Sequence, residues 1–271
     1  MQGLHRQIPT AKKVAYLDSL LRVGFDTLDF GSFVSPRAVP QMADTADVLA
    51  ALDLSQTRTR LLAIVANAQG AKDACRHAAI RYLGYPFSIS ETFQMRNTRR
   101  SVADSLVLVE ELLELCQTHE KELVVYLSMA FGNPYGDPWT PDLVAHWTAQ
   151  MAQRGVHTLA LADTVGTADP ETIGQLFHTL IPQFDSLTLG AHLHARPEDS
   201  QAKLVAAWEA GCRRFDVAML GYGGCPFAKD ELVGNIATGH LLDFLQQRQT
   251  PHSLDMEALA AASMQAAQIF E

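Results

Sequence analysis

The sequence of 271 residues predicts an α/β fold, and two observations support this prediction. Segments with the apolar spacing of helices alternate with short apolar segments that are typical of buried strands. No linker or low-complexity stretch interrupts the alternation, so we expect a single domain over residues 1–271. Strands that alternate with helices pair in parallel through right-handed crossovers. The pattern alone is compatible both with a (β/α)8 TIM barrel and with an open doubly wound sheet.

The individual elements are marked by ordinary helix and strand signals. Apolar residues at helical spacing, followed by Gly24, predict a first helix at residues 10–23. Ser90 is expected to cap a helix, and Pro141 and Pro170 stand at the favoured first helical position. The predicted strands are residues 25–30, 60–66, 79–88, 123–128, 158–162, 186–192 and 214–219. The predicted helices are residues 10–23, 39–52, 71–78, 90–120, 140–154, 169–180, 197–210, 235–247 and 255–270.

The number of strands distinguishes the two architectures only together with the motifs below. A (β/α)8 barrel needs eight strands, whereas the sequence opens with a helix and shows about seven. The simplest account is a barrel whose first strand lies upstream of Met1. We expect the last helix, at about residues 254–270, to pack on this barrel.

Composition excludes several classes of function. A formal net charge of -9 argues against a nucleic-acid-binding surface. The four cysteines include no C-x-x-C pair, which indicates a reducing compartment, in our interpretation the cytoplasm. Residues 1–13 lack the apolar core of a signal peptide, and no run approaches the roughly 20 apolar residues of a membrane span.

Two histidines mark a candidate metal site in the last third of the chain. His192 and His194 are expected at the end of a strand, where residues two apart project to the same face. In a barrel this face points inward at the carboxyl-terminal mouth, where active sites form. Two imidazoles there can share a divalent ion. The alternative is one packing histidine and one exposed histidine.

Mg²⁺ or Mn²⁺ would need oxygen ligands in addition to the two histidines. Asn235 can supply one oxygen, and a carboxylate could come from Asp29 or Asp163, each at the end of a predicted strand. Both aspartates could instead cap a helix or form a local turn, and for Asp163 this alternative is about as favourable.

A glycine-rich segment carries the fourth cysteine. Cys225 is preceded by Gly221, Gly223 and Gly224 and followed by a proline, as expected for a mobile loop that gates a site. A thiol on such a loop can donate or accept a proton once the site has closed. The alternative, a buried cysteine that acts as a small apolar residue, fits this glycine-rich context less well.

These motifs together resemble the 3-hydroxy-3-methylglutaryl-CoA lyase family, which is metal-dependent and adopts a (β/α)8 barrel. The resemblance covers nearly the whole chain, in the same order as in the family. The matching residues are Ser32-Phe33-Val34-Ser35-Pro36, Val39-Pro40-Gln41-Met42, Phe87-Ser88, Ser90-Glu91, Phe93, Asn97, Ser101, Ser128, Gly132, Pro134, Tyr135, Asp163-Thr164-x-Gly166, His192-x-His194 and Gly221-x-Gly223-Gly224-Cys225-Pro226.

The resemblance assigns roles to individual residues and implies an acyl-CoA substrate. His192, His194 and Asn235 resemble the metal ligands, Cys225 resembles the catalytic loop cysteine, and Asp29 stands where the family has an acidic residue near the reacting centre. The expected substrate-binding residues are Ser32, Asp163, Gly223 and Gly224. No cofactor other than the divalent ion is implied, and a homodimer is possible.

One departure bears on activity. The family opens with Pro-Arg-Asp-x-x-Gln, and Gln2 aligns with its glutamine, so the arginine and the aspartate would fall immediately before Met1. In the family they stabilise developing charge and bind the metal. We therefore expect this exact chain to have little activity. Alternatives are a Claisen-type synthase resembling isopropylmalate synthase, although its loop lacks the cysteine, a zinc hydrolase barrel, and a non-catalytic acyl-CoA binder.

Overall fold

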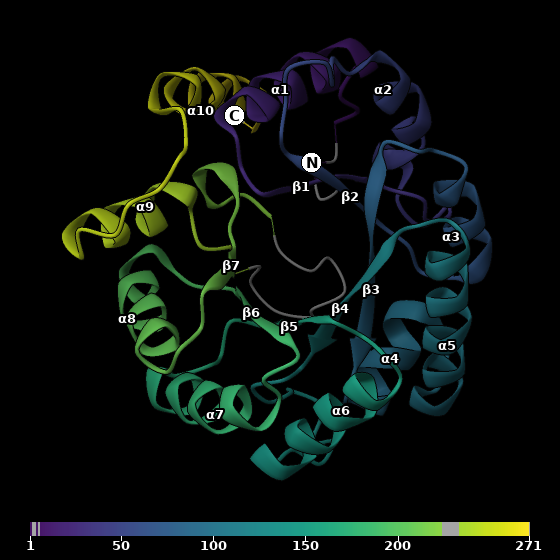
Figure 1. The fold of residues 1–271 in the computed structure, drawn as a ribbon, viewed down its shortest axis with the longest axis vertical. Coiled ribbons are helices and arrows are strands. Elements are labelled where there is room, and N and C mark those ends of the chain that lie inside the picture. The colour runs from purple at the N-terminus through teal and green to yellow at the C-terminus, as the bar shows by residue number, and fades with distance from the viewer. Residues whose placement is uncertain (2–3, 5, 224–232, 271) are drawn as a thin grey trace.

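Seven parallel strands form one curled sheet in a computed structural model that describes residues 1, 4, 6–223 and 233–270. Strands adjacent in sequence are neighbours in the sheet, which confirms the predicted alternation. Within the described residues, β1 and β7 are the two edges of the sheet (Figure 1). The strands are β1 (Thr27–Ser32), β2 (Arg60–Ile64), β3 (Ile80–Ser88), β4 (Glu122–Ser128), β5 (Thr158–Asp163), β6 (Thr188–Leu193) and β7 (Arg214–Asp216).

The helices surround the curled sheet on its outer side, as Figure 1 shows. The α-helices are α1 (Thr10–Val23), α2 (Thr45–Ala51), α3 (Ala68–Cys75), α4 (Glu91–Thr98), α5 (Val102–Thr118), α6 (Pro141–Gln153), α7 (Pro170–Gln183), α8 (Pro197–Glu209), α9 (Thr238–Gln247) and α10 (Met256–Phe270). Two 3-10 turns are η1 (Pro40–Met42) and η2 (Met219–Gly221).

The sheet has apolar packing on both faces. Its outer face and the helices share the large core, in which Leu83, Leu127 and Leu161 are fully buried. A second, small apolar cluster of Leu62, Tyr82 and Val124 fills part of the inside of the curl. This cluster comes from β2, β3 and β4, whereas His192 on β6 and Arg214 and Asp216 on β7 are polar.

Two predicted helices differ from the observed ones, one by a break and one by a later start. The helix predicted at 90–120 is divided into α4 and α5 because Arg99 adopts a left-handed conformation, with φ of 59°. Ser101 then caps α5 by accepting a hydrogen bond from the backbone N–H of Asp104. The helix predicted at 39–52 begins only at Thr45, since Val39 and Pro40 lead into the short turn η1.

The predicted boundaries around the carboxyl-terminal third are also wrong. The strand predicted at 214–219 ends at Asp216, and η2 follows. The helix predicted at 235–247 begins at Thr238, because Asn235 forms an isolated antiparallel bridge with His194 instead. This difference moves Asn235 from a helix to the end of β6, next to the two histidines.

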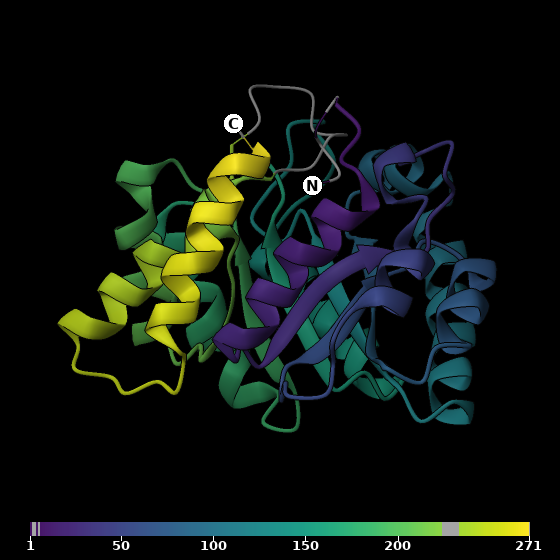
Figure 2. The same ribbon diagram turned by 90° about the horizontal axis from the view of Figure 1, so that it is seen from above.

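The last helix packs against the first. In both views α10 lies beside α1 (Figure 2), and the ring of Phe270 meets Tyr16 edge-on with centroids 6.0 Å apart. The backbone N–H of Asp255, just before α10, also donates to the carbonyl of Val23 at 2.9 Å. Throughout the described ranges, no helix combines the length and the apolar character that crossing a bilayer requires.

Gly70 allows α3 to approach the segment that follows β1. A Cβ at this position would lie 2.1 Å from the carbonyl oxygen of Phe33. We expect Gly70→Ala to destabilise the fold by about 1–3 kcal/mol, as overpacking typically does. In contrast, Gly174→Ala in α7, where the nearest atom is 3.9 Å away, is expected to stabilise it by about 0.5–1 kcal/mol. Denaturant unfolding of both variants checks the prediction, and equal effects would contradict it.

Candidate active site at the end of strand β6

The two histidines of the motif lie together at the carboxyl end of β6. His192 belongs to β6 and is in register with Asp216 of β7, while His194 follows the last residue of the strand. Their ring centroids are 5.5 Å apart. The ring of Tyr126, from β4, packs edge-on against His192 with centroids 5.4 Å apart. The structure therefore brings both predicted histidines to one place inside the curl of the sheet.

Each histidine has its Nδ1 atom held by an oxygen. His194 Nδ1 lies 2.9 Å from the carbonyl oxygen of Val233, and His192 Nδ1 lies 3.3 Å from Asp216 Oδ2. Since a carbonyl oxygen only accepts, Nδ1 of His194 carries the proton, and its Nε2 keeps a free lone pair. Burial lowers the pKa of His194 to about 4, with a smaller contribution from His192. His194 is therefore neutral at pH 7, as a metal ligand must be.

Asn235 is held beside these histidines by the backbone. It pairs with His194 in an antiparallel bridge, and the N–H of Ala195 donates to the carbonyl of Gly234 at 3.0 Å. The Asn235 side-chain Nδ2 donates to the carbonyl of Tyr222 at 3.4 Å, a bond that does not use the amide oxygen. The amide oxygen of Asn235 can therefore serve as a metal ligand in addition to one nitrogen from each imidazole.

This donor set fits a divalent ion in type and spacing. An ion bonded to both Nε2 atoms at about 2.1 Å would place the two ring centroids roughly 4.5–5.5 Å apart. The observed separation of 5.5 Å between His192 and His194 is compatible with this value. Over the residues that the structure describes, however, no three His, Cys, Asp or Glu side chains gather closely enough to hold an ion. Neither Asp29 nor Asp163 completes such a cluster with the histidines.

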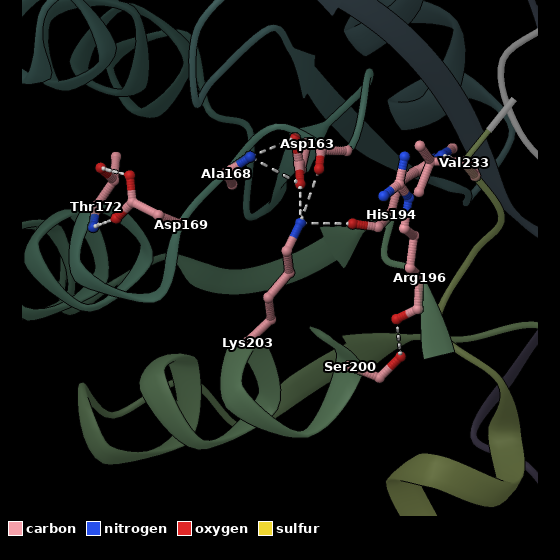
Figure 3. A network of polar contacts seen from close by, with 10 residues as sticks. Asp163, Ala168, Asp169, Thr172, His194, Arg196, Ser200, Lys203 and Val233 are labelled. Carbon is pink, nitrogen blue, oxygen red and sulfur yellow. Dashed lines mark hydrogen bonds and ion pairs between the residues drawn. The ribbon is translucent and has the colours of Figure 1, made fainter. Parts of the chain in front are cut away.

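Asp163 takes part in a buried ion pair. Lys203 of α8 donates to Asp163 Oδ2 at 2.8 Å, and both side chains are almost fully buried, 4% and 1% exposed (Figure 3). Burial raises the pKa of Asp163, and Lys203 opposes this effect. The backbone N–H of Ala168 also donates to the carboxylate, at 3.2 Å. These partners position Asp163 within the protein framework around the site.

The same lysine reaches the backbone of the candidate metal site. Besides Asp163, the Lys203 ammonium donates to the carbonyl of His194 at 2.8 Å and to that of Gly166 at 3.1 Å (Figure 3). Gly166 in turn lies under Val233, since a Cβ on Gly166 would be 2.8 Å from the Val233 side chain. Lys203 therefore joins the end of β5 to the end of β6, and its third partner, Gly166, packs against Val233.

A second set of polar residues lies on the inner face of β7. Asp216 contacts both His192 and Arg214, with Arg214 Nη2 at 3.1 Å from Asp216 Oδ1. Burial works to raise the pKa of Asp216, but Arg214 and then His192 outweigh it, so the pKa lies below its ordinary value. Sequence reasoning missed Arg214, Asp216 and Lys203. The alternation Arg214-x-Asp216 in a strand was the available signal for the first two.

Asp29 and Ser32 lie on β1. Asp29 is exposed on β1. Desolvation by the protein atoms around its carboxylate raises the pKa of Asp29 to about 7, with a smaller contribution from the like charge of Asp216, while the terminal ammonium of Met1 and the His192 ring oppose this shift. The Ser32 hydroxyl is buried and has no hydrogen-bond partner among the described residues. An unpartnered buried hydroxyl is suited to binding a ligand.

The glycine-rich segment is described only up to Gly223. Gly223 has φ of 130°, and a Cβ there would lie 2.3 Å from Asn235 Nδ2, so the backbone approaches Asn235 closely because no side chain intervenes. Gly224 and Cys225 lie outside the described residues. Their predicted roles therefore stay predictions.

Comparison with known proteins gives the family of this site. The sequence model of the HMGL-like family matches residues 1–265. The chain belongs to the HMGL-like family. This result confirms the resemblance that the ordered motifs indicated.

Characterised relatives and solved structures agree with this assignment. The chain is 32% identical to the (R)-citramalyl-CoA lyase of Chloroflexus aurantiacus, over 93% of this chain and 82% of that protein. It is 30% identical to the 3-hydroxy-3-isohexenylglutaryl-CoA/hydroxymethylglutaryl-CoA lyase of Pseudomonas aeruginosa, over 97% and 86%. It superposes on the HMG-CoA lyase of Brucella melitensis with a TM-score of 0.91 and 28% identity, covering 99% and 94%. An HMG-CoA lyase from Acinetobacter baumannii was solved with coenzyme A and 3-methylmalate. This chain superposes on it with a TM-score of 0.88 and 29% sequence identity, over 97% of this chain and 85% of that one.

Proposed function

We propose that this protein is a divalent-metal-dependent carbon–carbon lyase that cleaves a 3-hydroxyacyl-CoA thioester, with 3-hydroxy-3-methylglutaryl-CoA as the expected substrate. The observation that carries the proposal is the pair His192 and His194 beside Asn235. Each ring has its Nδ1 held by an oxygen, and among the described residues neither Nε2 has a hydrogen-bond partner. Family membership and the names of the relatives support the reaction class.

His192, His194 and Asn235 would hold Mg²⁺ or Mn²⁺. When bound, the ion would supply Lewis acidity that lowers the pKa of the substrate hydroxyl. The protein residues then have distinct tasks. The Nδ1 contacts fix the orientation of both rings, and the unpartnered Ser32 hydroxyl binds a polar group of the substrate. Asp163, through Lys203, keeps the backbone of His194 in place.

The proton transfers are assigned to Asp29 and Cys225. Asp29, whose pKa of about 7 suits a general base, accepts the proton of the substrate hydroxyl. The bond to the α-carbon of the thioester then breaks, its electron pair passes to the enolate of acetyl-CoA, and the hydroxyl carbon becomes a ketone. Cys225 donates a proton to the enolate carbon. With 3-hydroxy-3-methylglutaryl-CoA the products are acetoacetate and acetyl-CoA.

A second substrate is favoured by a specific observation. The 32% identical relative is a citramalyl-CoA lyase, so citramalyl-CoA is the second candidate. Both are 3-hydroxyacyl-CoA thioesters with a terminal carboxylate. The same proton transfers at Asp29 and Cys225 serve either of them.

The finer prediction for the fold is a (β/α)8 barrel. We propose this architecture because seven parallel strands in sequence order form one curled sheet with the helices on its outer side (Figure 1).

The assay is the release of acetyl-CoA from both thioesters at high enzyme concentration, with added Mn²⁺ and then with a chelator. We expect release that the chelator abolishes and that His192→Ala abolishes as well. The matched control His119→Ala, at the exposed end of α5, should leave the rate unchanged. If the unsubstituted protein released no more acetyl-CoA than the His192→Ala variant, the result would contradict the lyase and favour an acyl-CoA binder.

A further inference from the structure

Arg214 is a cation on the inner face of the sheet that the proposed reaction does not use. It precedes Asp216 by two residues on β7, so both side chains point to the same face. The strand pairing places Arg214 opposite Gly190 and Asp216 opposite His192 on β6. Arg214 therefore lies on the same inner face as His192, two residues nearer the amino-terminal end of the parallel strands.

Gly190 makes room for this arginine. A Cβ on Gly190 would lie 2.7 Å from Arg214 Nη1 and 3.1 Å from both Cγ and Cδ of the same side chain. The arginine thus crosses the face of β6 directly over the glycine backbone. This path lets its guanidinium reach Asp216 and the Tyr126 hydroxyl.

Arg214 contacts both groups that hold the His192 ring. Its Nη2 and Nη1 atoms lie 3.1 Å and 3.4 Å from the two oxygens of Asp216, and Oδ2 of the same carboxylate lies 3.3 Å from His192 Nδ1. The Tyr126 hydroxyl lies near the same guanidinium, and the Tyr126 ring packs edge-on against His192. A guanidinium that meets both carboxylate oxygens fixes the plane of the carboxylate, which a single point charge does not.

We propose that Arg214 is a positioning residue that fixes Asp216 and Tyr126 around His192, so that Nδ1 carries the proton and Nε2 is presented as a ligand. The proposal rests on the proposed function for what Nε2 binds, but the orientation of the ring is a property of the protein alone. Partners of this kind typically change metal affinity or activity by about 10–100-fold when they are removed.

The test compares Arg214→Met, Arg214→Lys and the neighbouring Arg213→Met. Arg213 points outward, where its guanidinium stacks on Trp208 at 4.0 Å, so it is a matched control. The first readout is the ¹⁵N spectrum of the histidine side chains without metal, with the His192 signals assigned through His192→Gln. The second readout is the dissociation constant for Mn²⁺.

In the unsubstituted protein we expect His192 as the Nδ1–H tautomer. Arg214→Met should shift it towards Nε2–H or a mixture and weaken Mn²⁺ binding about 10–100-fold. Arg214→Lys should fall between, and Arg213→Met should change neither readout. If Arg214→Met does not fold, Gly190→Ala is the substitute, because the new methyl group displaces the Arg214 side chain but keeps its charge. This variant should shift the His192 tautomer in the same direction, by a smaller amount.

Two results would overturn the proposal, namely an unchanged His192 tautomer in a folded Arg214→Met protein, or equal changes in Arg213→Met. Failure of the unsubstituted protein to bind Mn²⁺ would instead contradict the metal-dependent function. The tautomer comparison would still decide the role of Arg214 in that case.

Discussion

Replacing Lys203 with methionine is expected to destabilise the fold by about 3–5 kcal/mol, because it leaves the carboxylate of Asp163 buried without its cation. The variant also loses the bonds to the carbonyls of Gly166 and His194. The loss should be greatest at neutral pH and smaller in acid, where the unpaired carboxyl of Asp163 takes up a proton. Denaturant unfolding at pH 8 and pH 5 measures both values.

The double variant Asp163→Asn/Lys203→Met and an exposed ion pair provide the controls. The double variant should recover part of the stability, since no buried charge remains. Arg248→Met, which removes the partner of the exposed Glu209, should cost less than about 1 kcal/mol. A Lys203→Met protein as stable as Arg248→Met would show that the buried pair contributes nothing to this fold.

Asp29→Asn is expected to lower the rate of thioester cleavage by about 10²–10⁴-fold, the usual contribution of a general base. In the unsubstituted protein the rate should fall as the pH decreases through about 7, because Asp29 must be ionised to accept a proton and its pKa is raised to about 7. Single-turnover cleavage from pH 5 to pH 9 measures the profile. The variant should lose this dependence.

Stability gives a second readout for Asp29 that is independent of turnover. The pKa of Asp29 is about 7 in the folded state and about 3.9 in the unfolded chain, so the folded state favours the protonated form. The resulting stabilisation is present in acid and is lost as the pH rises towards 7. Asp29→Asn should therefore have a higher Tm than the unsubstituted protein at pH 8 and an equal Tm near pH 4. The difference at pH 8 should be modest, because Asp29 is exposed to solvent.

Asp185→Asn, in an exposed turn, is the control for both readouts. It should leave the Tm difference and the rate profile unchanged. If the difference in Tm between Asp29→Asn and the unsubstituted protein were the same at pH 4 and pH 8, it would contradict the raised pKa of Asp29. Full activity of that variant would contradict the role of Asp29 as the base.

The sequence alone determined the alternation of helices and strands, the seven parallel strands and the family. It also placed His192 and His194 at the end of a strand, because residues two apart on a strand share a face. The ordered motifs named Asn235 as their companion. All of these inferences use spacing along the chain, which local periodicity reports directly.

The tertiary structure decided which partners hold those residues. Asp163 and Lys203 are 40 residues apart in sequence, and His192 and Asp216 are 24 apart, so no local period relates them. Arg214 reaches Asp216 along a path that exists only because Gly190, on the neighbouring strand, has no side chain. Likewise Asn235 meets His194 through a backbone bridge, where its sequence pattern favoured a helix. Spacing reports which face of its own element a residue occupies, whereas the partner across the sheet depends on register and packing between elements.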